Sequence, residues 1–170
     1  MLDRKAPSVE TPSEQTSETW KHIPWRKLER YCFRMQQRIF RASQQGNQRA
    51  VHKLQKLLMK SEAARTLAVR RVTQDNQGKK TAGIDGQTAL HAHQRLTLVR
   101  QIHPKHWPKK ATPVRRMSIP KPGKEEKRPL GIPTIAQRAR QMLINLALEP
   151  EWEAKFEANS YGFRKGALMP

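Results

Sequence analysis

The sequence predicts an α+β fold, in which a mostly helical N-terminal region is followed by a β-hairpin and a further helix. Two observations carry this prediction. Apolar residues recur at steps of three and four between residues 25 and 67, which is the spacing of one helical face. Between residues 114 and 134 the pattern changes, because two short apolar runs flank a polar turn that contains Pro122 and Gly123.

The first 19 residues are rich in Ser, Thr, Glu and Pro, and we expect them to form a disordered leader because they offer little to bury. They lack the apolar core of a signal peptide, and no apolar run approaches the ~20 residues that span a bilayer. Cys32 is the only cysteine, so no intrachain disulfide can form, and the six histidines show no metal-ligand spacing. We therefore expect a reducing compartment, no secretion and no metal site.

A first helix is expected to begin near Trp25, with one apolar face and one basic face. Its apolar positions are Trp25, Leu28, Cys32, Met35, Ile39 and Ala42, and its basic positions are Arg26, Lys27, Arg30, Arg34, Arg38 and Arg41. After a break at Gly46, one second helix is expected to bury Val51, Leu54, Leu57, Leu58, Ala64 and Leu67. The short connection predicts that the two helices pack as a hairpin.

Residues 73–87 have the composition of a loop, and residues 89–102 that of a short helix. After the β-hairpin, Thr134 and Gln137 have the spacing of a capping box. The helix that they begin is expected to bury Ile135, Ala139, Met142, Leu143 and Leu146. Pro150 is expected to break or restart this helix. The acidic residues around that break are expected to form a solvated face: Glu149, Glu151 and Glu153.

Charge is the dominant feature of the composition, with a formal net charge of +20 and a pI near 11.0. The first 19 residues are net −2 and the last 30 are net −1, so residues 20–140 carry +23. A compact body with this self-repulsion favours a polyanionic partner, either nucleic acid or an anionic membrane. The membrane is the weaker alternative, because no segment has the character of an anchor. A small basic protein of the ribosomal type would have the same charge and size.

Basic residues gather in three clusters. The first surrounds the hairpin turn: Lys121, Lys124, Lys127 and Arg128. The second leads from helix into loop: Arg65, Arg70, Arg71, Lys79 and Lys80. The third includes Trp107 and His106: Lys105, Lys109, Lys110, Arg115 and Arg116. Basic groups next to an aromatic ring suit RNA, whose bases stack on rings. A hairpin tip that is charged only for solubility remains the alternative for the first cluster taken alone.

Three longer motifs occur in order: AVRRVTQDNQGKKTAGIDG, RRMSIPKPGKEEKRPLGIPTIAQRARQ and ALEPEWEAKFEANSYGFRKG. Together they resemble the N-terminal extension and fingers of group II intron-encoded reverse transcriptase/maturases, over residues 20–166. Beyond the leader over 1–19, the resemblance implies a helical RNA-binding N-terminal domain over 20–105 and an incomplete fingers portion of a right-hand polymerase fold over 106–170. It also implies a bacterial cytoplasm or an organellar matrix as the compartment.

The resemblance assigns roles to matching positions. The N-terminal extension of this family helps to bind intron RNA and lies over the template, a role that would fall to helices 25–67 and the basic loop ending in Gly86. The individual residues expected to contact RNA belong to the second and third clusters: Arg65, Arg70, Arg71, Lys79, Lys80, Arg115 and Arg116. The fingers hairpin supplies a Lys and an Arg to the phosphates of the incoming nucleotide, and Lys121 and Arg128 match these. The template-side YGFR segment matches at Tyr161, Phe163 and Arg164, whereas Asp85 matches a turn position.

The resemblance implies that the chemistry lies outside this chain. The family binds Mg²⁺ through aspartates of the palm, and such chemistry needs clustered carboxylates. This chain has three aspartates in all, Asp3, Asp75 and Asp85, and none is on an expected strand. After YGFR it reads KGALMP, with Lys165 and Ala167 where the family has Pro and Arg. We therefore expect no catalytic residue, metal or cofactor in this chain, and no polymerisation by it alone.

The expected partners are group II intron RNA, a template RNA with its DNA primer, and the palm and thumb of a longer chain. Two interpretations remain open from the sequence. The chain is either part of a longer RNA-directed DNA polymerase, as a fragment or a truncated reading frame, or a stand-alone RNA-binding or splicing-helper protein.

Overall fold

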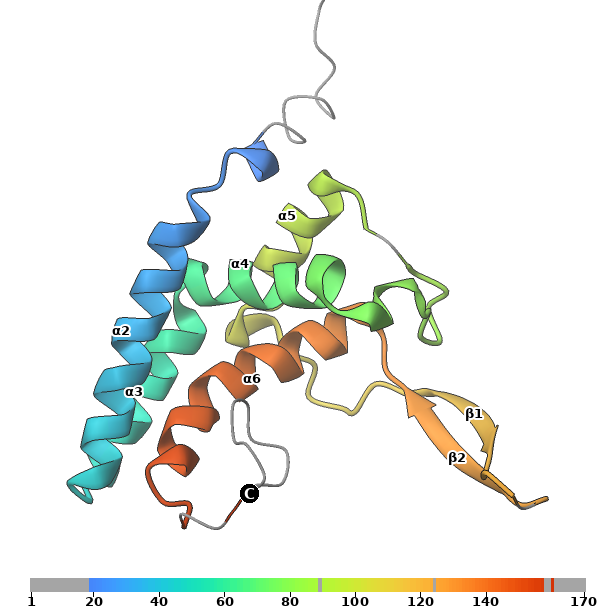
Figure 1. Cartoon of the computed structure of the whole chain (residues 1–170). Coiled ribbons are helices and arrows are strands. Elements are labelled where there is room, and N and C mark those ends of the chain that lie inside the picture. The colour runs from blue at the N-terminus through green and yellow to red at the C-terminus, as the bar shows by residue number, and fades with distance from the viewer. Residues whose placement is uncertain (1–18, 89, 124, 158–159, 161–170) are drawn as a thin grey trace, which may run out of the picture.

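The computed structural model describes residues 19–88, 90–123, 125–157 and 160. Within these ranges, packed helices form a body from which a two-stranded antiparallel hairpin projects (Figure 1). The described part of the chain is therefore mostly helical with one small sheet, which confirms the predicted α+β class. The first two helices, α2 (Trp25–Gln44) and α3 (Gln48–Lys60), lie side by side along one edge of the body.

The connection between α2 and α3 explains why they fold back on each other. Gly46 has φ +68°, a left-handed conformation that favours glycine at the end of a helix. Asn47 then caps α3, because its side chain accepts a hydrogen bond from the Ala50 amide at 3.0 Å. The predicted helical hairpin is confirmed, with Ile39 of α2 and Val51 and Leu58 of α3 completely buried.

The prediction of one second helix was wrong, because the chain bends at Ser61 into a separate helix α4 (Glu62–Arg70). The Ser61 side chain serves both helix ends: its hydroxyl donates to the Leu58 carbonyl at 2.7 Å and accepts from the Ala64 amide at 3.2 Å. Leu57 of α3 is half exposed, not buried as predicted. The apolar periodicity continues across Ser61, so it gave no sign that one helix ends and another begins at this serine.

The expected loop begins with helical turns. A π-helical turn (Arg71–Asp75) continues α4, and a 3₁₀ turn (Gln77–Lys80) follows it. Asp85 lies in a turn, as expected, where its carboxylate accepts from the Gln87 amide at 3.3 Å. Helix α5 (Ala92–Gln101) comes next and packs on α4. A short 3₁₀ turn (Pro104–His106) then leads toward the hairpin.

The hairpin consists of β1 (Arg115–Pro120) and β2 (Lys127–Ile132), as the two apolar runs predicted. Its register pairs Arg115 with Ile132 and Pro120 with Lys127. The turn contains Gly123 at φ +70°, a conformation that most side chains disfavour. Both strands are largely exposed and stand away from the helices, so the hairpin tip is accessible (Figure 1).

The last helix, α6 (Ile135–Glu153), runs through the centre of the body and packs against α2, α3 and α4. The predicted capping box is confirmed: Thr134 Oγ1 accepts from the Gln137 amide, and the Gln137 side chain accepts from the Thr134 amide. The predicted break at Pro150 was wrong, because α6 continues through it to Glu153. The carbonyl of Leu146, which loses its usual backbone donor at Pro150, accepts instead from the Gln36 side chain at 2.9 Å.

The acids around Pro150 do not all form the solvated face that was predicted. Glu151 is 7% exposed and accepts hydrogen bonds from Gln55 at 2.7 Å and from Lys155 at 2.6 Å. The hydrogen bond from Lys155 lowers the pKa of Glu151, and Gln55 adds to this, although burial acts in the opposite direction. Glu151 therefore joins α6 to α3 as a buried carboxylate, and sequence periodicity missed it because its partner on α3, Gln55, is 96 residues away along the chain.

Candidate nucleic-acid interface

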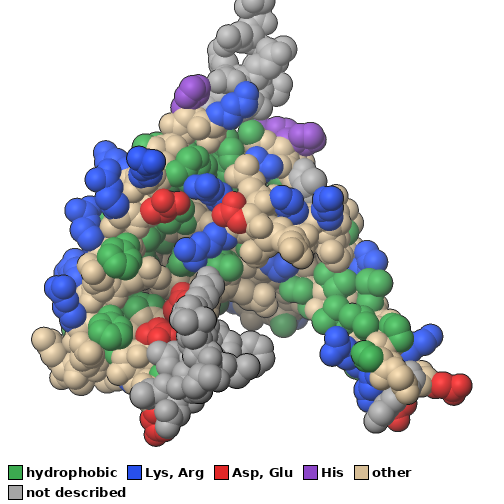
Figure 2. Space-filling model, in the orientation of Figure 1, with side chains coloured by type: hydrophobic (Ala, Val, Ile, Leu, Met, Phe, Trp, Pro, Cys, Tyr) green, Lys and Arg blue, Asp and Glu red, His purple; other side chains and the backbone are tan. Residues whose placement is uncertain are grey.

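The outward face of α2 carries a stripe of positive charge. Because the opposite face of the helix is buried in the core, every basic residue of the stripe is exposed: Arg26, Lys27, Arg30, Arg34, Arg38 and Arg41. At 1.5 Å per residue the stripe is about 22 Å long. Lys and Arg side chains follow this edge of the molecule in the space-filling view (Figure 2). We call these six residues the α2 stripe.

The α2 stripe has almost no acidic neighbour on its own helix. Glu29 is the only acidic residue between Trp25 and Gln44, and its carboxylate lies 3.4 Å from Arg70 of α4. Within the described part no ion pair joins a stripe residue to a carboxylate, although Glu149 and Glu153 of α6 line the same groove as Arg41. The resemblance assigned an RNA-binding role to helices 25–67 as a whole, and the sequence showed this basic face, but none of its six residues was named as an individual RNA contact. The helical spacing of the six residues is the signal that singles them out.

Two members of the second cluster are engaged within the protein. Arg65 donates to the Val99 carbonyl at 2.7 Å and so ties α4 to α5, and its burial lowers the pKa of its guanidinium. Arg70 lies between Glu29 at 3.4 Å and Asp75 at 3.8 Å, with its guanidinium 4.5 Å from the centre of the Trp25 ring. These arginines have structural partners, which leaves them less free to bind RNA than the α2 stripe.

The remaining members of the second cluster differ in how accessible they are. Lys79 donates to the Gln74 carbonyl at 2.5 Å across the loop. Lys80 is exposed, whereas Arg71 is half-buried. The structure therefore brings Arg70 and Arg71 to the end of α4 and places Lys79 and Lys80 on the turn that follows, with Lys80 the most accessible cation of the group.

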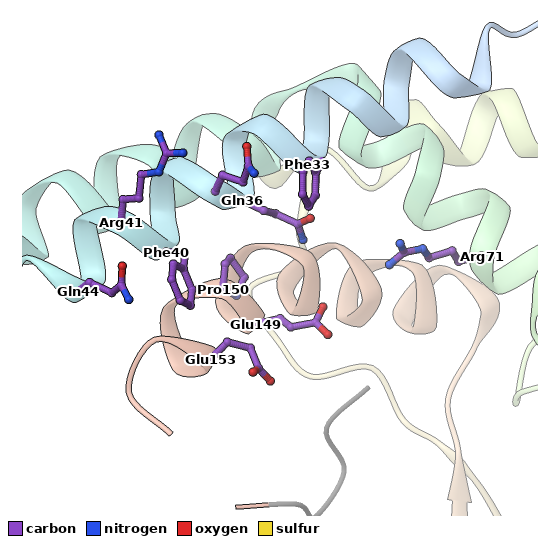
Figure 3. A pocket seen from close by; sticks show the side chains of 10 residues that line it. Phe33, Gln36, Phe40, Arg41, Gln44, Arg71, Glu149, Pro150 and Glu153 are labelled. Atoms are coloured by element: carbon purple, nitrogen blue, oxygen red, sulfur yellow. The ribbon is translucent and has the colours of Figure 1, made fainter. Parts of the chain in front are cut away.

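Arg71 also borders a groove of about 680 Å³ between α2 and α6. Its lining combines aromatic, basic and acidic side chains, with Phe33, Phe40 and Arg41 from α2 and with Glu149 and Pro150 from α6 (Figure 3). Phe33 is 60% exposed, which is unusual for an aromatic side chain.

Cys32, one residue earlier, is buried on the core side, and burial raises the pKa of its thiol to about 11.

The register of the hairpin sorts its basic residues onto two faces. Residues that are directly opposite in an antiparallel pair share a face, and neighbours along a strand alternate. Arg128 is opposite Ile119, so it shares a face with Arg115 and with the exposed Met117 and Leu130. Lys127 is opposite Pro120 and shares the other face with Arg116. The adjacent arginines 115 and 116 therefore point to opposite sides.

Lys121 and Arg128 occupy different electrostatic settings. Lys121 forms an ion pair with Glu126 at 2.6 Å, while its amide donates to the Glu126 carbonyl at 3.0 Å and closes the turn. Arg128 is exposed, and no hydrogen bond or ion pair reaches its guanidinium from the described residues. Of these two expected nucleotide contacts, Arg128 is thus the one that is free to receive a phosphate.

Several expectations fall on residues that the structure does not cover. Tyr161, Phe163, Arg164 and Lys124 lie outside the described residues. Among the described residues, no group of three His, Cys, Asp or Glu side chains is placed to hold a metal ion. The helices of the described part are also too short or too polar to cross a membrane.

The chain matches known proteins along most of its length. Residues 20–102 match the family model described as the N-terminal domain of reverse transcriptase. The protein called Maturase-like protein 1 of Euglena gracilis is 35% identical over 145 residues, which are 85% of this chain and 31% of that protein. Protein YkfC of Escherichia coli is 37% identical over 99 residues, 55% of this chain and 25% of that protein.

A shorter match connects the chain to a protein whose name states its origin. The group II intron-encoded protein LtrA of Lactococcus lactis is 46% identical over 52 residues, which are 31% of this chain and 9% of that protein. The chain thus spans less than a third of the length of these relatives.

Proposed function

The chain belongs to the group II intron reverse transcriptase/maturase family and corresponds to its N-terminal region, and from this we propose that it binds RNA through the α2 stripe. The observation that carries the proposal is that six exposed cations follow one face of α2 with a single acid among them. A phosphate backbone carries regularly spaced negative charges. An extended basic surface can neutralise these charges, and the counterions that were bound to the backbone are then released.

The names of the relatives favour intron RNA as the natural ligand, since they describe a maturase-like protein and a group II intron-encoded protein. The contacts expected from the sequence at Lys80, Arg71 and the hairpin face with Arg115 would extend this surface. In this proposal Arg65, Arg70 and Lys79 support the fold more than they bind RNA, because each already has a partner within the protein.

The hairpin supports a second part of the proposal, which concerns the polymerase activity of the family. Arg128, and Lys121 once it is released from Glu126, would contact the phosphates of an incoming nucleotide when the hairpin forms part of a right-hand polymerase. Guanidinium and ammonium groups suit this task because they form charge-assisted hydrogen bonds to phosphate oxygens. The Mg²⁺ ions of that reaction would be held by residues outside those described here, and supply the charge neutralisation at the triphosphate.

Binding of a labelled RNA stem–loop tests the first part of the proposal. Fluorescence anisotropy would follow binding to the whole chain over a series of KCl concentrations, with anionic lipid vesicles as competitor. If the α2 stripe neutralises about five phosphates, the log–log salt slope should be roughly −4, since each contributes about −0.7 to −0.9. A slope near zero would contradict RNA binding by this surface. Equal competition by vesicles at equal charge would show a general preference for polyanions.

A further inference from the structure

The basic turn that carries Lys79 and Lys80 is held against the first turn of α6. The Arg138 guanidinium of α6 donates to two carbonyls of this segment, Gly78 at 2.6 Å and Thr81 at 2.7 Å. Gly78 lies 60 residues and Thr81 lies 57 residues before Arg138 in the sequence. Both acceptors belong to the segment 77–81, so a single planar side chain fixes both ends of the basic turn.

A second contact holds the same segment from the other side. Gly83 lies so close to the backbone of Pro133 and Thr134 that an added Cβ would stand 2.7 Å from the Thr134 Cα. No side chain fits at that distance unless the backbone moves. The segment 78–83 is therefore docked on the start of α6 by a two-carbonyl clamp and by a close backbone approach. We call this arrangement the α6 junction.

The same turn of α6 also holds the hairpin. Gln137, adjacent to Arg138, donates to the Thr112 carbonyl at 2.9 Å, three residues before β1 begins. At the other end of the hairpin, β2 ends at Ile132, two residues before the cap Thr134. The basic turn and both ends of the hairpin thus meet at one helix start, although they belong to regions far apart in the sequence.

We propose that Arg138 is a positioning residue, which holds the exposed Lys80 in a fixed relationship to the hairpin so that RNA bound at this turn is aligned with the hairpin face. The proposal rests on the proposed RNA-binding function. Both terminal nitrogens of Arg138 donate to protein carbonyls, so its effect on RNA passes through the turn that carries Lys80. The clamp holds the turn in one conformation, and a charge that is already immobilised loses less conformational entropy when it binds a phosphate. Without the clamp, Lys80 should therefore bind a phosphate more weakly.

The docking itself is tested without RNA, by hydrogen–deuterium exchange on the whole chain. Arg138→Ala should speed exchange of amides in 78–83 selectively and leave α2 and α3 unchanged. Gly83→Ala should do the same from the opposite side of the junction. Arg140→Ala, which removes an equal charge from the same helix two residues further on, is the matched control. Unchanged exchange in 78–83 in both junction variants would overturn the clamp.

The consequence for RNA is tested by a double-mutant cycle with the labelled stem–loop. Lys80→Ala and Arg138→Ala should each weaken binding several-fold, and the double variant should be no weaker than Lys80→Ala alone. Arg138→Lys should rescue only in part, because an ammonium cannot span two carbonyls as the guanidinium fork does.

Additive effects of Lys80→Ala and Arg138→Ala, or an Arg138→Ala chain that binds RNA as wild type does while Lys80→Ala is weakened, would overturn the positioning role. A flat salt slope for the wild-type chain would instead show that the RNA-binding function has failed. The exchange measurement would then still decide whether Arg138 holds the turn.

Discussion

The Gln36 side chain of α2 donates a hydrogen bond of 2.9 Å to the backbone carbonyl of Leu146 in α6. That carbonyl is four residues before Pro150, which has no amide hydrogen to offer it. A buried carbonyl without a donor costs free energy, and proline inside a helix usually interrupts it for this reason. Gln36 supplies the missing donor from a different helix. This contact explains how α6 continues to Glu153 and packs on α2 along its length.

Replacing Gln36 should therefore destabilise the fold by about 1–3 kcal/mol, the cost of leaving a buried carbonyl unsatisfied. The free energy of unfolding, from urea titrations, measures the effect of Gln36→Ala. Gln37→Ala is the matched control, because Gln37 is exposed on the same helix. In a Pro150→Ala background the backbone regains its own donor, so Gln36→Ala should cost much less there. An equal cost in both backgrounds would contradict this role.

The buried carboxylate of Glu151 predicts a pH dependence of stability. Its pKa in the folded protein is lowered, first by the hydrogen bond from Lys155, from an ordinary value of 4.5. Its contribution is therefore fully present above pH 4.5 and is lost as the pH falls through the lowered folded value. Glu151→Gln should reduce the free energy of unfolding by about 1–3 kcal/mol at pH 7.

The difference between wild type and Glu151→Gln should stay constant from pH 7 to 6 and shrink below pH 4.5. Urea unfolding across this range measures it, and Glu149→Gln provides a control that removes the same charge from the same helix. A gap that persists unchanged at pH 3, or a large effect of the control, would show that Glu151 is not the group that titrates.

Local chemistry explains which parts of the fold could be predicted. The α2–α3 hairpin, the capping box at Thr134 and the β-hairpin depend on residues close together in sequence, and all were predicted. The bend at Ser61 was missed because a serine that caps two helices at once leaves the apolar period unbroken. The passage of α6 through Pro150 and the burial of Glu151 depend on Gln36 and Gln55, more than 90 residues away. No local pattern reveals such partners.

The candidate site shows the same division. The basic clusters were visible in the sequence, but the sequence did not show which of their side chains already have partners within the protein. Arg65 and Arg70 belong to a cluster by sequence, yet each has acceptors within the protein. Arg138 was unremarkable in the sequence, because the two carbonyls that it binds are brought to it only by the fold.

The hairpin makes a prediction that needs an active polymerase background, such as a longer relative carrying this hairpin. There Arg128→Ala should raise the nucleotide KM and lower kcat, with a loss of about 2–4 kcal/mol in kcat/KM, as removal of a charge-stabilising donor typically does. Lys127→Ala is the matched control, since the register places Lys127 on the opposite face. If Arg128→Ala weakens template binding and leaves the nucleotide KM unchanged, the hairpin contacts only the RNA backbone.

Lys121 should respond to its ion-pair partner in the same background. Lys121→Ala should act in the same direction as Arg128→Ala but less strongly, because Glu126 already holds the ammonium at 2.6 Å. Glu126→Gln should free Lys121 and lower the nucleotide KM. Steady-state kinetics with varied nucleotide measures both, and a rise in KM on Glu126→Gln would contradict this arrangement.

Primer extension by this chain alone should be undetectable at any Mg²⁺ concentration. The reaction needs clustered carboxylates to hold two metal ions, and the chain has only three aspartates, Asp3, Asp75 and Asp85, none of which was expected on a strand. A radiolabelled primer on an RNA template, with a longer family member as the positive control, gives the measurement. Incorporation that survives stringent purification would place an active site within this chain.

The most direct test of the account is the salt dependence of RNA binding after the α2 stripe is neutralised. Arg30, Arg34 and Arg38 changed together to Gln should flatten the log–log slope by about 2, since each lost phosphate contact removes roughly 0.7–0.9. The control changes Lys53, Lys56 and Lys60 to Gln, because these exposed lysines of α3 carry an equal charge on the neighbouring helix. Thermal melts would confirm that both variants fold. If RNA binds along the α2 stripe, the slope should be flattened in the α2 variant and nearly wild type in the α3 variant, and equal slopes in the two variants would contradict binding at this surface.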